Sequence, residues 1–190
     1  MAPATALTSF SPSSFSPAST ATTTTAPGPQ LIRAACANVA PDQDLCFSSI
    51  SSHPASAQAD LRQLAAIAVR AADEKVADTA AFLSTLPASV TNSGAATDPV
   101  TDQCVNDCME LYVDASELLD MCAAAVDDER DADAANWMEA ALSDVASCES
   151  GCGAVTTAEM AKRKPRAKKQ LNIGLSLRSF ILSGKHVTRE

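Results

Sequence analysis

The sequence has 190 residues, is rich in Ala and Asp, and contains only six Gly and 4% aromatic residues. This composition favours one all-α domain over a β-sheet protein, because strands are enriched in β-branched and aromatic residues. Residues 1–159 carry 22 acidic and 5 basic side chains, whereas residues 160–190 carry 9 basic and 1 acidic. An acidic main domain repels nucleic-acid phosphates, and no apolar run could span a bilayer, so we expect neither a nucleic-acid nor a membrane partner.

Residues 1–29 are rich in Ser, Thr, Pro and Ala and contain no charged residue. Such a segment can bury little apolar surface, which predicts a disordered or targeting segment. It has neither the positively charged start nor the continuous apolar stretch of a secretory signal peptide, so no signal peptide is recognisable. We expect a single helical domain over residues 30–190.

A short helical hairpin is predicted at the start of this domain, over residues 31–50, with Pro41 at its turn. Apolar residues then recur at steps of three and four from Leu61 to Leu83, which indicates one long amphipathic helix. A polar loop at 87–97 separates this helix from the next.

Two further helices are predicted from regular apolar faces, which are separated by a short charged stretch. The faces comprise Cys104, Cys108, Leu111, Ala115, Leu118, Cys122 and Val126 on the first helix and Trp137, Ala141, Val145, Cys148 and Cys152 on the second. Because the intervening stretch is short, these two helices should lie antiparallel.

The last segment alternates apolar and polar residues between Gln170 and Leu177, as a strand would. A lone strand would leave its edges unpaired in a helical protein, so we predict a fourth helix starting near Pro165. The expected fold is an all-α, up-down-up-down four-helix bundle that is preceded by an N-terminal helical hairpin and stapled by disulfides.

Seven cysteines are more than a reduced cytosolic protein of this size usually keeps, which indicates an oxidising compartment. Residues that touch across two antiparallel helices have position numbers with a constant sum. Two pairs satisfy this rule one helical turn apart: Cys108 with Cys148, and Cys104 with Cys152. Cys36 and Cys46 are then left to close the hairpin.

A zinc site is the alternative for the two C-x3-C pairs, because four thiolates could face one another across the two helices. Structural zinc prefers C-x2-C turns with freer ligand geometry, so we favour disulfides and expect no metal. The seventh cysteine, Cys122, lies on the predicted core face, where it is interpreted as a buried small hydrophobe.

Catalytic motifs are missing from the sequence. The two histidines, His53 and His186, match no metal-ligand spacing, and no Gly-rich phosphate loop, dinucleotide fingerprint or G-x-S-x-G elbow occurs. Runs of acidic residues are more typical of a solvated surface than of an acid/base pair. We therefore expect a protein that is not an enzyme and needs no cofactor.

The run of basic residues from Lys162 to Lys169 has two interpretations. It could be a nuclear-localisation or anionic-surface patch. A solvated linker or helix start that balances the acidic domain is the more common case, and the sequence leaves its role open.

The segments C-M-E-L-Y-V-D-A-S-E-L-L (Cys108 to Leu119) and A-N-W-M-E-A-A-L-S-D-V-A-S-C (Ala135 to Cys148) resemble the plant invertase and pectin methylesterase inhibitor family. The resemblance covers roughly residues 30–184. It implies a disulfide across the hairpin and another between the second and third long helices, in agreement with the pairs above. It also implies an extracellular, monomeric inhibitor that forms a one-to-one complex over the active-site cleft of a pectin methylesterase or an acid invertase.

Pectin methylesterase is the favoured target on this resemblance. Invertase inhibitors of the family carry Pro-Lys-Phe at the start of the third long helix, where this chain has Asp131, Ala132 and Asp133. Trp137 and the segment 140–142 look more like the pectin methylesterase side. The alternatives are inhibition of acid invertase and a non-inhibitory, disulfide-bonded helical binding protein.

A candidate partner-binding surface is an acidic stripe on the second long helix. Its four residues step by three, four and three positions, so they share one helical face: Asp107, Glu110, Asp114 and Glu117. This stripe could meet a basic rim of the target enzyme, although an ordinary solvated face would show the same pattern.

Overall fold

The computed structural model describes residues 28–86, 99–152 and 158–182, which form helices joined by short turns. The predicted segment 1–29 lies outside the described residues except for its last two. The helices are α1 (Pro29–Cys36), α2 (Gln43–Ser51), a 3-10 helix (Pro54–Gln58), α3 (Leu61–Thr85), α4 (Pro99–Asp127), α5 (Asp131–Gly151) and α6 (Ala158–Leu182). None of these helices is long and apolar enough to cross a membrane.

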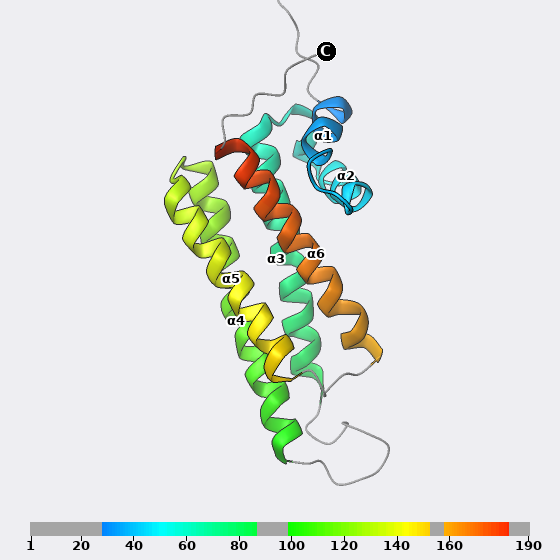
Figure 1. Cartoon of the computed structure of the whole chain (residues 1–190), viewed down its shortest axis with the longest axis vertical. Coiled ribbons are helices and arrows are strands. Elements are labelled where there is room, and N and C mark those ends of the chain that lie inside the picture. Colours follow the sequence, from blue (N-terminus) through cyan, green and yellow to red (C-terminus); the bar gives the residue numbers. More distant parts are fainter. Residues whose placement is uncertain (1–27, 87–98, 153–157, 183–190) are drawn as a thin grey trace, which may run out of the picture.

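Four long helices form an up-down-up-down bundle (Figure 1). α3 runs away from the hairpin of α1 and α2, α4 returns, α5 descends beside α4, and α6 returns beside α3. α3 packs extensively against both α4 and α6, and α4 packs against α5. The hairpin sits at one end, against α3 and α6. The predicted fold class is confirmed.

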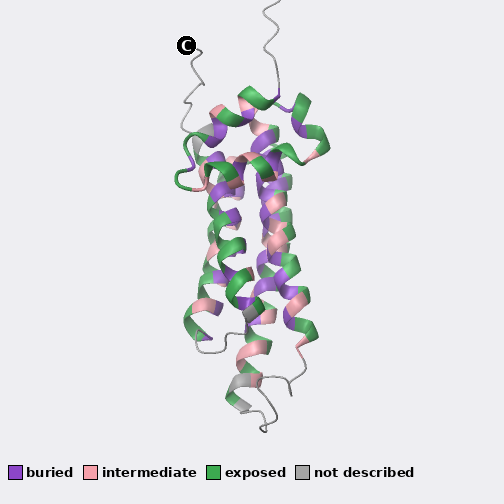
Figure 2. Ribbon diagram, turned by 90° about the vertical axis from the view of Figure 1, so that its right-hand side faces the viewer, coloured by how far each residue is buried: buried purple, intermediate pink, exposed green. Residues whose placement is uncertain are grey.

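α3 is the central helix of the bundle because its first half is buried on nearly every side. It begins at a capping box, in which the Asp60 carboxylate accepts from the backbone N–H of Gln63 and the Gln63 side chain accepts from that of Asp60. The six residues from Leu64 to Val69 are all buried, and three of them are Ala. Small side chains let the neighbouring helices approach closely, which explains the high Ala content. Figure 2 shows buried residues along the inward sides of the long helices.

The core faces of α4 and α5 differ slightly from the predicted ones. Tyr112, Leu119 and Met138 are fully buried. Leu111, Leu118 and Trp137, which were predicted to lie on the core faces, are only partly buried. α4 and α5 are therefore rotated about their own axes relative to the prediction, so that some buried positions lie one residue after the predicted ones.

α6 begins seven residues before the predicted start, and Pro165 lies inside it. Proline removes one backbone hydrogen bond from a helix, so it usually lies in the first turn. Here Pro165 is exposed to solvent, while Met160 and Ala167 are buried on either side of it. The packing of this first part of α6 against the bundle offsets the missing hydrogen bond.

Residues 170–177 alternate like a strand in sequence but are helical in the structure, and their buried residues follow helical spacing. Gln170 and Gly174 are buried together with Leu177, at helical steps of four and three. The Gln170 side chain donates to the Ser49 hydroxyl at 3.0 Å. A Cβ at Gly174 would lie 3.3 Å from the terminal methyl of Met138 on α5, which is a tight contact. A polar residue and a glycine thus occupy core positions in α6.

Candidate protein-docking face

Two disulfides join α4 to α5 near the end of the bundle opposite the hairpin. Cys108 bonds to Cys148 and Cys104 bonds to Cys152, with Cα–Cα distances of 4.8 and 5.6 Å. A third disulfide, Cys36–Cys46, joins α1 to α2. These are the three pairs that the sequence predicts. The thiolates needed for the alternative zinc site are therefore consumed, and the described residues contain no cluster suited to a metal ion.

The acidic stripe lies on the solvent-exposed side of α4. Asp107, Glu110, Asp114 and Glu117 are all exposed. Among them, Asp107 accepts a hydrogen bond from the Gln103 side chain one turn earlier, at 2.6 Å. No described Lys or Arg forms an ion pair with any of the four, so their negative charge is not neutralised within the protein.

Three large apolar side chains are exposed on the same helix, and they are the only such residues in the part of the chain that the structure describes: Val100 (72% exposed), Val113 (42%) and Met121 (41%). At about 100° per residue, they fall on the same side of α4 as the acidic stripe. We call this surface the α4 face; it comprises Val100, Asp107, Glu110, Val113, Asp114, Glu117 and Met121. No motif in the sequence marks these three apolar residues as part of a binding surface.

A groove of about 520 Å³ continues the α4 face toward α5. Val100 and Asp107 line it from α4, Gly151 lines it from α5, and the two interhelical disulfides form part of its wall. The disulfides hold the two helices at a fixed separation, so the groove and the α4 face form one rigid surface. This surface suits docking of a protein, since it combines exposed carboxylates with exposed apolar groups.

The acidic stripe also affects the pKa of Asp144 on α5. Its partial burial, together with the nearby Asp114 carboxylate, raises the pKa of Asp144 above its ordinary value. A raised folded-state pKa means that the folded protein holds this proton more tightly than the unfolded chain does. Stability is therefore lost as pH rises from the unfolded value near 3.8 through the folded value.

Asp144→Asn should stabilise the protein at pH 7, by less than about 1 kcal/mol because solvent screens the partly exposed carboxylate. The gain should vanish below the unfolded pKa, where Asp144 is protonated in both states. Guanidinium denaturation at pH 7 and pH 3.5 measures both effects. Glu139→Gln, which neutralises an exposed acid on the same helix, is the control. A stabilisation that is equal at the two pH values would contradict this assignment.

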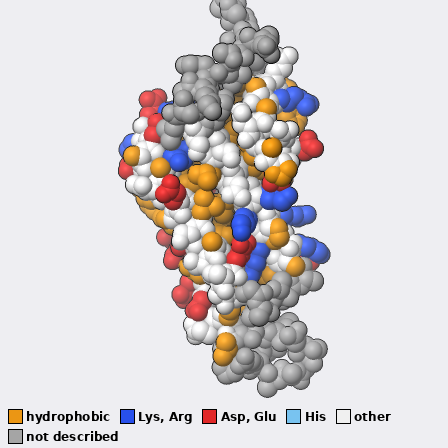
Figure 3. All heavy atoms as spheres, viewed as in Figure 1, with side chains coloured by type: hydrophobic (Ala, Val, Ile, Leu, Met, Phe, Trp, Pro, Cys, Tyr) orange, Lys and Arg blue, Asp and Glu red, His pale blue; other side chains and the backbone are white. Residues whose placement is uncertain are grey.

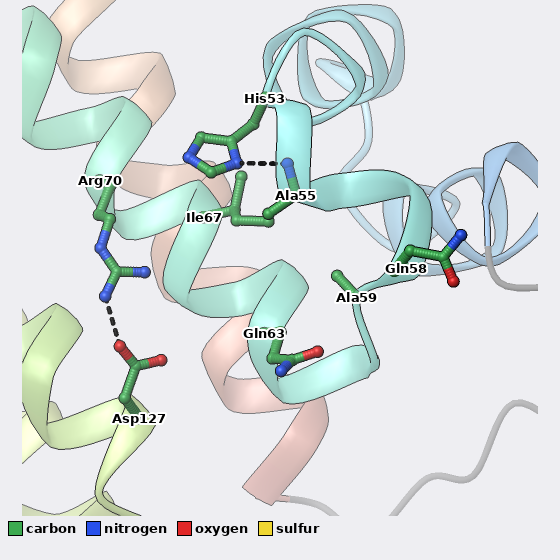
Figure 4. Close-up of a pocket in the computed structure, with 8 residues that line it drawn as sticks. All are labelled: His53, Ala55, Gln58, Ala59, Gln63, Ile67, Arg70 and Asp127. Carbon is green, nitrogen blue, oxygen red and sulfur yellow. Dashed lines mark hydrogen bonds and ion pairs between the residues drawn. The ribbon is translucent and has the colours of Figure 1, made fainter.

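A second pocket, of about 360 Å³, lies between the 3-10 helix and the adjoining ends of α3 and α4 (Figure 4). The His53 ring points into it, and its Nδ1 accepts from the backbone N–H of Ala55 at 3.3 Å. Arg70 forms an ion pair with Asp127 across the pocket. Arg70 and Asp127 are thus paired with each other, and His53 is the remaining titratable residue among those that line the pocket.

Cys122 is fully buried, as the sequence predicts, and is the free cysteine among the described residues. Its thiol donates to the carbonyl oxygen of Ala134 at 3.3 Å, which adds a contact between α4 and α5. Burial raises the pKa of Cys122 to about 11, and Arg178 offsets this only in part. The thiolate is therefore scarce at neutral pH, and the residue acts as a small core side chain.

Comparisons with known proteins agree with this architecture. The model of the family described as plant invertase/pectin methylesterase inhibitor matches residues 30–177. A crystal structure of a pectin methylesterase inhibitor from Arabidopsis thaliana is similar at a TM-score of 0.54 and 16% sequence identity, covering 84% of this chain and 97% of that one. A search of curated proteins found no significant match. Because the family model spans well over half of the sequence, the chain belongs to the plant invertase/pectin methylesterase inhibitor family.

Proposed function

We propose that this protein inhibits a pectin methylesterase by docking the α4 face over the enzyme's active-site cleft, as a monomer in a one-to-one complex. The observation that carries the proposal is the composition of this face, where four unpaired carboxylates surround exposed Val113 and Met121. Protein interfaces combine apolar anchors with a charged surround, and the charges accelerate association with a partner of opposite sign.

Membership in an inhibitor family supports a role without catalysis, and the structural neighbour is itself a pectin methylesterase inhibitor. The three disulfides fit the extracellular setting of such an inhibitor, since these bonds persist in oxidising compartments. We therefore place the protein in the cell wall space, together with the target enzyme.

The start of α5 favours pectin methylesterase over acid invertase. At the positions where invertase inhibitors carry Pro-Lys-Phe, this chain has two carboxylates that are already engaged. Asp131 forms an ion pair with Arg62 at 2.7 Å, and Asp133 pairs with Arg130 at 2.8 Å. Neither a lysine nor an aromatic residue occupies these three positions for an invertase. Asp131 instead ties the start of α5 to α3, and Asp133 pairs within the α4–α5 turn.

Titration of purified, oxidised protein against a plant pectin methylesterase and, in parallel, an acid invertase tests the proposal. We expect stoichiometric inhibition of the esterase at one inhibitor per enzyme, no inhibition of the invertase, and no activity of the protein alone on pectin or sucrose. Selective inhibition of the invertase would reverse the choice of target. Inhibition of neither enzyme by the folded protein would leave a helical binding protein without inhibitory function.

A further inference from the structure

The basic residues of α6 gather on the side of the molecule that lies away from the acidic helices. Figure 3 shows Lys and Arg side chains clustered over α6 toward the right of the view, while most Asp and Glu side chains lie to the left, over α4 and α5. α6 carries seven basic residues and one acidic residue. The proposed docking of α4 leaves this second charged surface without a role.

Part of this surface is a pocket of about 180 Å³ between α3 and α6, which we call the basic groove. It is lined by Lys75, Asp78, Thr79, Glu159, Lys162, Arg163 and Arg166. Lys162 and Arg166 are exposed and lie one helical turn apart. Arg166 has no hydrogen bond or ion pair within the described residues, so its guanidinium is available to an anion.

Arg163 is held in place in the basic groove. Its Nη1 donates to the carbonyl oxygen of Asp78 at 3.3 Å, and its guanidinium lies 4.7 Å from the centre of the Phe82 ring. Its Nε is buried and meets no hydrogen-bond acceptor in the described part of the chain. An ordered guanidinium loses little entropy when it binds an anion, which distinguishes the basic groove from a set of mobile lysines.

The local electrostatic field in the basic groove is positive despite its two acidic residues. The hydrogen bond from Lys162, with Arg163 and Arg166 nearby, lowers the pKa of Glu159. Farther along α6, Lys169 reaches Asp42 on α2, and on the other side of the helix Lys168 pairs with Glu149 on α5. Such exposed pairs are weak and exchange readily for an external anion.

We propose that the basic groove binds a polyuronate, a linear polysaccharide that carries a carboxylate on each sugar, and so anchors the inhibitor to the polymer on which its target acts. The choice of polyuronate rests on the proposed function, because a pectin methylesterase converts methyl esters of such a polymer into carboxylates. Lys162 and Arg166 bind carboxylates, while Asp78 and Glu159 accept hydrogen bonds from sugar hydroxyls.

The mixed charge of the basic groove favours this ligand over other polyanions. A nucleic-acid backbone or an anionic lipid surface presents densely packed phosphates, which the acids in the groove and the acidic body behind it would repel. A polyuronate has a lower charge density and presents hydroxyl donors beside its carboxylates.

Binding of polygalacturonate oligomers to the purified, oxidised full chain tests the inference by calorimetry. We expect measurable binding that weakens roughly tenfold between 50 and 200 mM salt, and no binding of the fully methyl-esterified oligomer. The double variant Lys162→Gln/Arg166→Gln should weaken binding about fivefold or more. The control Arg33→Gln/Arg130→Gln makes the same change in net charge at distant surface sites and should stay within about twofold of the native affinity.

Equal binding of the esterified and free oligomers, or native affinity in Lys162→Gln/Arg166→Gln, would overturn the inference. Tighter binding of duplex DNA or of phosphatidylserine vesicles would replace the polyuronate with a phosphate-rich ligand and also overturn it. Inhibition is assayed separately on a short esterified oligomer. Loss of polyuronate binding with full inhibition removes only this inference, whereas binding without inhibition removes only the proposed function.

Discussion

Removing both disulfides between α4 and α5 is expected to destabilise the protein by about 7 kcal/mol, which approaches the total stability of a typical domain. The change is Cys104→Ala/Cys108→Ala/Cys148→Ala/Cys152→Ala. In the chain-entropy model, the outer disulfide closes a loop of 48 residues in the unfolded chain and contributes about 4 kcal/mol. With that loop closed, the inner disulfide adds only a ring of about ten residues, which contributes about 3 kcal/mol.

Removing either disulfide alone should cost about 3 kcal/mol, because the remaining one still closes a loop of nearly the same length. Cys108→Ala/Cys148→Ala and Cys104→Ala/Cys152→Ala should therefore unfold at similar guanidinium concentrations, well above the quadruple variant. Equilibrium denaturation followed by circular dichroism measures all three.

Cys122→Ala is the matched control, since it removes a buried sulfur that forms no disulfide. It separates the cost of lost packing from the cost of the lost cross-link. If removing either pair alone cost as much as removing both, the remaining disulfide would contribute nothing by itself, and the entropic account would be wrong.

Most of the fold could be predicted because the long helices have regular periodicity and the cysteines add a geometric constraint. The matching position sums of the two cysteine pairs fix both the antiparallel direction and the register of α4 against α5. The capping box of Asp60 and Gln63 at the start of α3 is a local signal that agrees with the packing there. A fold can be predicted from its sequence when local patterns and tertiary constraints agree in this way.

α6 could be predicted only in part because its core stripe contains residues that look non-core. Gln170 is buried through a hydrogen bond to α2, and Gly174 is buried against the Met138 side chain of α5, and neither reason is visible in α6 itself. The remaining apolar residues then alternate like a strand. Pro165 likewise suggests a helix start, and only the packing of Met160 shows that the helix begins earlier.

For a similar reason, only the acidic residues of the α4 face could be predicted, and its exposed apolar residues could not. Acidic residues at helical spacing identify an exposed side, so the stripe could be found from its pattern. Val113 and Met121 are apolar residues in an amphipathic helix, and their exposure depends on how α4 is rotated against α3 and α5. The burial of Tyr112 and Leu119 fixes that rotation, and side-chain packing of this kind is decided by the partner helices.

Reversing two charges on the α4 face should weaken inhibition of pectin methylesterase by about 30- to 100-fold at low salt, or roughly 2–3 kcal/mol. The change is Glu110→Lys/Glu117→Lys, which alters two exposed residues beside Val113. Positive charges there would repel the basic rim that the acidic stripe is proposed to meet. The loss should appear mainly in the association rate and should shrink as salt screens the charges.

Glu129→Lys/Glu139→Lys is the control, because it changes two exposed glutamates outside the α4 face and alters the net charge by the same amount. Inhibition constants and association rates are compared at 20 and 300 mM salt, with thermal denaturation to show that both variants are folded. A large loss in Glu110→Lys/Glu117→Lys alone would place the enzyme on the α4 face. Equal losses in both variants would indicate a general effect of net charge. Native inhibition by Glu110→Lys/Glu117→Lys at both salt concentrations would mean that the acidic stripe is a solvated surface and that another face of the bundle contacts the enzyme.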